Sequence, residues 1–151
     1  MAKLLLFGYG NLGRGDDALG PSLINRIALS QFSHVECQSD MQLQIEHVTD
    51  LAACNQALLV DADSSCAEPF TFSRVVAEKD NSYTTHAMTP STLLHVYQEV
   101  YGYPPPPTFL LRIRGYHFGF GATLSSKATT NLEAAVKVVG RLCKIGDFEV
   151  C

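Results

Sequence analysis

Residues 3–17 read KLLLFGYGNLGRGDD, and this stretch decides what kind of fold the chain adopts. Residues 3–7 form a largely apolar run that stops at glycines, as expected for a strand buried on both faces of a sheet. Apolar residues then recur at helical spacing over 17–27, with acids at the start, where the helix dipole favours them. A buried strand that leads into a helix indicates an α/β fold.

The same alternation continues along the rest of the chain. Further strands are expected at 34–37, 57–60, 70–77 and 109–113, and further helices at 43–51, 89–100 and 124–142. The link between the third and fourth strands is too short for a helical crossover, so these two strands must run antiparallel if they are neighbours. We therefore predict a single domain over residues 1–151. Its fold is an α/β three-layer αβα sandwich, around a mostly parallel five-stranded sheet with one antiparallel strand.

Composition excludes several classes of function. The formal net charge is −4 and no basic run occurs, so nothing predicts a nucleic-acid surface. No apolar stretch approaches the roughly 20 residues that cross a membrane, and the short run at 4–8 is interpreted as a strand rather than a signal peptide. The five cysteines are odd in number and include no CxxC pair, which argues against disulfides and structural zinc. We expect free thiols, a reducing compartment and a cytoplasmic protein.

The glycine loop after the first strand suggests one candidate function. Residues 8–13, GYGNLG, match the dinucleotide-binding pattern GxGxxG, and Glu36 lies near the end of the second expected strand. However, Asp16 and Asp17 follow where a pyrophosphate would rest at the helix N-terminus. At an effective dielectric constant of about 20, like charges at about 4 Å repel by about 4 kcal/mol. A dinucleotide-binding module therefore stays as the alternative hypothesis.

Two carboxylates and a histidine suggest a second candidate. Asp17 follows the first strand, Asp61 follows the third directly, and ligands of such sheets bind at the carboxyl ends of the strands. His86 lies in a polar stretch before a helix. This set suits a divalent transition metal with open coordination positions, without naming the metal. Asp16 and Asp63 either orient these ligands or serve as a helix N-cap and a loop acid, and we favour the second interpretation.

Three segments resemble the motifs of the hydrogenase maturation endopeptidases, which remove the C-terminal extension from large-subunit precursors of nickel–iron hydrogenases. The segments are GYGNLGRGDDALGP at 8–21, LLVDAD at 58–63 and THAMTPSTLL at 85–94. The resemblance covers nearly the whole chain. It implies that Asp17, Asp61 and His86 are the nickel-binding and catalytic residues, and that the precursor carries the nickel. It also implies that the partner is the hydrogenase large-subunit precursor, and we expect a monomer.

The sequence departs from the family pattern at two places. The family often has Glu where this chain has Asp17, and it commonly shows a Gly-Thr motif where residues 37–47 read CQSDMQLQIEH. Together with IRGYHF at 113–118, this stretch resembles the branch that serves NAD-linked bidirectional hydrogenases. His117 either lines a groove for the substrate or packs over the sheet end. The hydrolytic step stays open between a carboxylate acting as general base on water and a metal that polarises the carbonyl.

Overall fold

The apolar runs of the sequence form a central sheet. A computed structural model describes residues 3–79 and 88–151, and within these ranges the chain forms one five-stranded sheet in the order β2-β1-β3-β5-β4. Its strands are β1 (Leu4–Tyr9), β2 (Val35–Asp40), β3 (Gln56–Asp63), β4 (Phe70–Arg74) and β5 (Thr108–Arg114). All neighbouring pairs are parallel except β4 and β5, which are antiparallel. The predicted mostly parallel sheet is confirmed.

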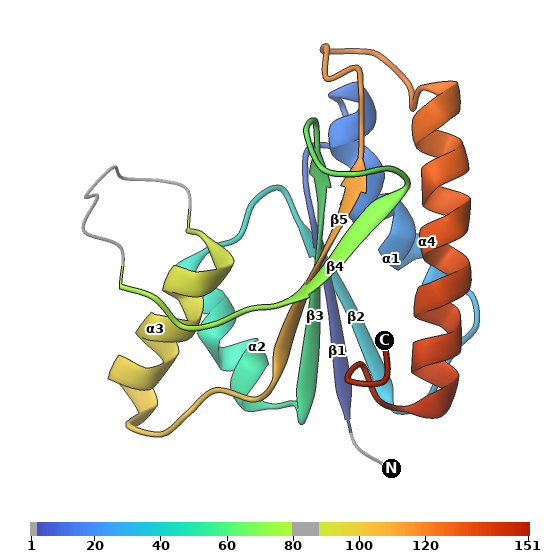
Figure 1. Cartoon of the computed structure of the whole chain (residues 1–151). Coiled ribbons are helices and arrows are strands. Elements are labelled where there is room, and N and C mark those ends of the chain that lie inside the picture. The colour runs from blue at the N-terminus through green and yellow to red at the C-terminus, as the bar shows by residue number, and fades with distance from the viewer. Residues whose placement is uncertain (1–2, 80–87) are drawn as a thin grey trace.

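Helices cover both faces of the sheet, so the three-layer prediction is also confirmed (Figure 1). They are α1 (Leu19–Ala28), α2 (Val48–Ala52), α3 (Pro90–Tyr101) and α4 (Ser126–Ile145), with 3-10 turns η1 (Gly15–Ala18) and η2 (Ile45–His47). Successive residues of a strand point to opposite faces. Leu4 and Leu6 therefore enter the core with residues of α1 and α4, whereas Leu5 and Phe7 enter the core with residues of α2 and α3.

Some predicted boundaries differ in the structure, which also defines one neighbour that the sequence left open. The antiparallel strand β4 borders β5 rather than β3, because β5 itself pairs with β3 and leaves only the outer edge free. The strand expected at 70–77 ends at Arg74, the last residue in register with β5. The third strand continues through Asp61 and Asp63, since both still pair with β5. The expected helix at 17–27 starts as the 3-10 turn η1, and α1 begins at Leu19.

Glycines bring the start of α1 against the end of the sheet. A Cβ on Gly8 would lie 2.5 Å from the carbonyl oxygen of Gly20, and a Cβ on Gly20 would lie 2.6 Å from that of Val60. Only glycine fits at either position, so the turn before α1 lies directly above the carboxyl ends of β1 and β3. Asp17 lies in this turn, which places its carboxylate at that edge of the sheet.

Among the helices of residues 3–79 and 88–151, none combines the length and the apolar character that crossing a membrane requires.

Candidate active site

The structure brings Asp17 and Asp61 together at the carboxyl edge of the sheet. Asp17 is held by its own loop, since its Oδ2 accepts a hydrogen bond from the Asn11 amide at 2.7 Å. Asp61 lies at the end of β3, next to β1, and its side chain is half-buried. The pKa of Asp61 is raised to about 7, mainly by burial and also by the charges of Asp17 and Asp63, and hydrogen bonding lowers it only in part. The two carboxylates are therefore electrostatically coupled.

Tyr9 belongs to the same site, although the sequence analysis did not select it. Its hydroxyl lies close to the Asp61 carboxylate, and the proximity lowers the pKa of Asp61 and raises that of Tyr9. Burial raises the pKa of Tyr9 far above its usual value, so the phenol stays protonated and remains a donor. Arg112 is opposite Asp61 in the β3–β5 register, and its charge also acts on Tyr9. Two features of the sequence could have indicated these residues. Tyr9 points to the same face of β1 as Phe7, and Arg112 interrupts the apolar run of β5.

The third predicted ligand, His86, lies outside the described residues, within 80–87. In the described ranges no group of three or more His, Cys, Asp or Glu side chains is placed to hold a metal ion. Asp17 and Asp61 thus supply two carboxylates with the oxygen chemistry that a divalent cation accepts. The complete ligand set stays a prediction.

Asp16 is not the helix N-cap that we expected. The residue before α1 is Ala18, and no side chain caps this helix. Asp16 is instead fully buried, with 0% of its surface exposed. Its carboxylate accepts four hydrogen bonds, from Tyr116 N (2.7 Å), His117 N (3.0 Å), Ser125 N (2.7 Å) and Ser125 Oγ (2.7 Å). Burial raises the pKa of Asp16, but these bonds outweigh it and hold the pKa below its ordinary value. The prediction failed because these partners lie about a hundred residues further along the chain.

Asp63 acts as the loop acid that the sequence favoured. Its Oδ1 accepts hydrogen bonds from the amide and hydroxyl of Ser65 at 2.7 and 2.9 Å, and from the amide of Cys66 at 3.2 Å. Its Oδ2 lies 3.4 Å from Nη1 of Arg112. The bonds from Ser65 and the charge of Arg112 hold the pKa of Asp63 below its usual value. Asp63 therefore closes the turn after β3 and orients Arg112.

The glycine loop lacks the geometry of a dinucleotide site. Its Asn11 amide, which would face a pyrophosphate, already donates to the Asp17 carboxylate. A Cβ on Gly10 would lie 1.9 Å from the backbone oxygen of Asp17, so this glycine serves the packing of the loop on itself. Glu36 is the second residue of β2, at the amino end of the strand, because β2 extends to Asp40 rather than ending at 37. Glu36 therefore lies at the opposite end of the strand from the glycine loop.

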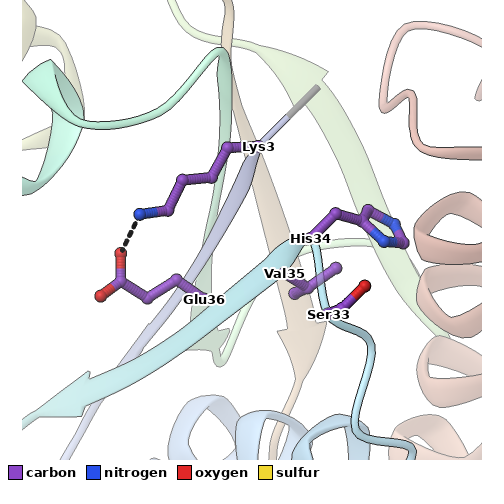
Figure 2. A pocket seen from close by; sticks show the side chains of 5 residues that line it. All are labelled: Lys3, Ser33, His34, Val35 and Glu36. Carbon is purple, nitrogen blue, oxygen red and sulfur yellow. Dashed lines mark ion pairs between the residues drawn. The ribbon is translucent and has the colours of Figure 1, made fainter. Parts of the chain in front are cut away.

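A cavity of about 660 Å³ lies at that amino end, lined by Lys3, Ser33, His34, Val35 and Glu36 (Figure 2). The side chains of Lys3, Glu36 and His34 already have partners. Nζ of Lys3 lies 3.7 Å from Oε2 of Glu36, and Nε2 of His34 lies 2.7 Å from the carbonyl oxygen of Cys143. With these groups paired, the cavity shows no arrangement of reactive side chains, and the carboxyl edge remains the candidate site.

The fold is that of the hydrogenase maturation proteases of known structure. The [NiFe] hydrogenase maturation protease HycI from Thermococcus kodakarensis matches with a TM-score of 0.73 at 19% identity, over 95% of this chain and 93% of that chain. The maturating endopeptidase HybD from E. coli matches with a TM-score of 0.69 at 21% identity, over 95% and 94% of the two chains. A hydrogenase 2 maturation peptidase from a Thaumarchaeota archaeon matches with a TM-score of 0.63 at 22% identity, over 95% and 98%. The sequence itself matches no protein-family model and no curated protein. The likeness therefore establishes the fold.

Proposed function

We propose that this protein is an endopeptidase that removes the C-terminal extension of a nickel-loaded hydrogenase large-subunit precursor. The observation that carries the proposal is the pairing of Asp17 and Asp61 at one edge of a fold shared over nearly the whole chain with hydrogenase maturation proteases. In the proposal the nickel belongs to the precursor, and Asp17, Asp61 and His86 bind it. Recognition of the metal places the scissile bond beside these residues.

The chemistry of the carboxylate pair is consistent with this role. Two adjacent carboxylates repel each other and attract a cation, so binding of the precursor's nickel relieves the repulsion between Asp17 and Asp61. Tyr9 lies beside Asp61 and offers a protonated hydroxyl to its carboxylate. Hydrolysis of the peptide bond then requires an activated water. Two routes supply one: a carboxylate as general base, or polarisation of the carbonyl by the substrate's metal.

The partner and location follow from the same proposal. The partner is the large-subunit precursor, and on the residues at 37–47 and 113–118 we assign the protein to the branch that serves NAD-linked bidirectional hydrogenases. We further propose that the protein is cytoplasmic, because its five cysteines are free thiols, and that it is a monomer. No observation favours the dinucleotide alternative, because the amide and the acid that it needs are engaged elsewhere or misplaced.

The test is incubation of the purified protein with the large-subunit precursor of the source organism, nickel-loaded and nickel-free. Loss of the C-terminal extension is followed by mass spectrometry. We expect cleavage of the loaded precursor alone. Asp17→Asn, Asp61→Asn and His86→Ala should each lower the rate at least a hundredfold, because each removes a ligand that positions the bond.

Matched controls separate this effect from general damage to the protein. Asp50→Asn and His95→Ala change the same residue types on α2 and α3, away from the carboxyl edge, and should keep the rate within twofold. Normal cleavage by all three site variants would refute the site assignment. An inactive wild-type protein, tested on every hydrogenase precursor of its host, would refute the function.

A further inference from the structure

Two loops at the carboxyl edge are joined into one unit, which comprises residues 11–16 and 116–122. Three backbone hydrogen bonds of 2.7–3.1 Å link them: Gly15 N to Ala122 O, Asp16 N to His117 O and Gly121 N to Gly13 O. The buried Asp16 carboxylate adds its bonds to the amides of Tyr116 and His117. A Cβ on Gly15 would lie 2.4 Å from the carbonyl oxygen of His117, so the two segments are in direct contact. We call this unit the joined loops.

The joined loops expose large apolar side chains to solvent. Phe120 is 81% exposed and Leu12 is 64% exposed. The guanidinium of Arg14 lies 4.8 Å from the centre of the Phe120 ring, and its Nε donates to the carbonyl oxygen of Phe118 at 3.3 Å. A single exposed apolar residue needs no explanation. An exposed aromatic ring held by an arginine is different, because aromatic residues and arginine are both enriched at protein interfaces.

The position of these side chains relative to Asp17 is fixed by the fold. Asp17 follows the buried Asp16 directly, and its amide donates to the carbonyl oxygen of Arg14 at 3.2 Å. The loop after β5 projects beyond the end of the sheet, as its orange trace shows (Figure 1). This loop therefore lies close to Asp17, where a folded protein that brings a metal ion to Asp17 would meet it. The hydrogen bonds within the joined loops also reduce the conformational entropy that these loops would lose on binding a partner.

We propose that Leu12, Arg14 and Phe120 form a docking surface for the folded large-subunit precursor. The inference rests on the proposed function, and it adds a contact region that lies outside the carboxylates and the histidine. The complementary face of the precursor is apolar where it meets Phe120 and Leu12, and it offers an acceptor, a carboxylate or a carbonyl, to Arg14. Docking here holds the folded body of the precursor while its extension lies at Asp17.

The test compares steady-state processing of the nickel-loaded precursor by the wild-type protein and by Phe120→Ala, Leu12→Ala and Arg14→Ala. Because the three side chains are exposed, the variants should fold, and thermal unfolding verifies this. We expect Phe120→Ala to raise KM about tenfold and the two other variants to raise it about threefold, with kcat changed less than twofold. Leu29→Ala and Arg141→Ala are the controls, since both residues are exposed outside the joined loops, Leu29 directly after α1 and Arg141 on α4. Their KM should not change.

A second measurement separates docking from the metal site. Binding of the loaded precursor to the cleavage-deficient Asp61→Asn protein should weaken about tenfold when Phe120→Ala is added. If the wild-type protein cleaves and all three variants keep KM within twofold, the docking surface is refuted and the proposed function stands. A fall in kcat at constant KM would also refute it, because these side chains would then act on the reacting groups. If the wild-type protein does not cleave the precursor, both proposals fail.

Discussion

At the scale of single residues, the site contains a carboxyl group that its own fold holds in an unfavourable state. Burial and the neighbouring charges raise the pKa of Asp61 to about 7, so the carboxylate form is disfavoured at neutral pH. A residue kept for stability alone would be paired with a cation or replaced by an amide. An aspartate such as Asp61, buried beside a second carboxylate, is typical of functional sites, where a bound cation offsets the unfavourable ionisation.

The unfavourable ionisation of Asp61 predicts how Asp61→Asn changes the free energy of unfolding. Because the folded pKa of Asp61 is raised, the destabilisation that Asp61 causes is absent below the unfolded pKa of about 4. It grows as the pH rises from there to the folded pKa of about 7 and is complete above that pH. Asp61→Asn should therefore stabilise the isolated protein by roughly 2–4 kcal/mol at pH 8, with no gain near pH 4. Urea unfolding at both pH values measures this difference.

The control for this prediction is Asp50→Asn, on α2, whose effect should not follow the same pH profile. An Asp61→Asn protein that is less stable than wild type at pH 8 would contradict the argument. The same variant should be inactive in processing, so that stability and function change in opposite directions.

Single residues also mark the limit of what the sequence predicts. Asp61 follows an apolar run directly and Asp17 ends the loop after another, so their place at the carboxyl edge could be predicted from the order of elements. The role of Asp16 could not, because its partners Tyr116, His117 and Ser125 lie far along the chain in a loop without periodicity. Two adjacent acids give the same sequence pattern whether one of them caps a helix or is buried under a distant loop.

At the scale of elements, the apolar runs predicted every strand of the described residues, but several of the predicted ends were wrong. Apolar periodicity reports burial, and polar residues such as Asp61 and Asp63 still pair with β5 at the sheet edge. The neighbour of β4 could not be predicted, for a different reason. Length excludes a helical crossover between β3 and β4, but it does not say which edge the antiparallel strand joins.

The contact of α1 with the sheet makes a prediction at this scale. Gly20→Ala places a Cβ 2.6 Å from the Val60 carbonyl oxygen and 2.7 Å from that of Tyr9, both backbone atoms that cannot move aside alone. The first turn of α1 must then shift away from β1 and β3, at a cost of roughly 1–3 kcal/mol. Thermal unfolding measures the loss. Because Asp17 precedes this turn, processing of the precursor should also slow.

Gly140→Ala is the matched control within α4. Its Cβ would meet only Cδ1 of Ile27, at 4.0 Å, so the helix has room for the methyl group. This variant should gain about 0.5–1 kcal/mol, because alanine favours a helix interior over glycine. Equal effects of the two substitutions would contradict the close approach of α1 and the sheet.

At the scale of the whole molecule, the parallel sheet gathers the candidate site at one edge. The three segments 8–17, 61–66 and 115–125 meet there, and the first two were predicted because ligands bind at the carboxyl ends of parallel strands. The third was recognised only as a possible groove or cover. The role of His86 as a ligand stays a prediction from its motif, since residues 80–87 lie outside the described ranges.

The reactivity of the cysteine thiols depends on whether the whole molecule is folded. All five are free, as predicted, but their exposure differs: Cys151 is exposed, whereas Cys143 is completely buried in the core between α4 and the sheet. Burial raises the pKa of the Cys143 thiol to about 12, so it carries almost no reactive thiolate. Both exposure and ionisation therefore require the core to open.

Thiol labelling of the native protein should consequently proceed in separate steps. Cys151 should react within the mixing time of an aromatic disulfide reagent, whereas Cys143 should react only through global unfolding. Mass spectrometry of peptides from a labelling time course in increasing urea separates the two sites. The rate at Cys143 should rise with urea as steeply as the global unfolding equilibrium. A rate at Cys143 that is independent of urea would mean that α4 opens locally, and that the core on this face is not one cooperative unit.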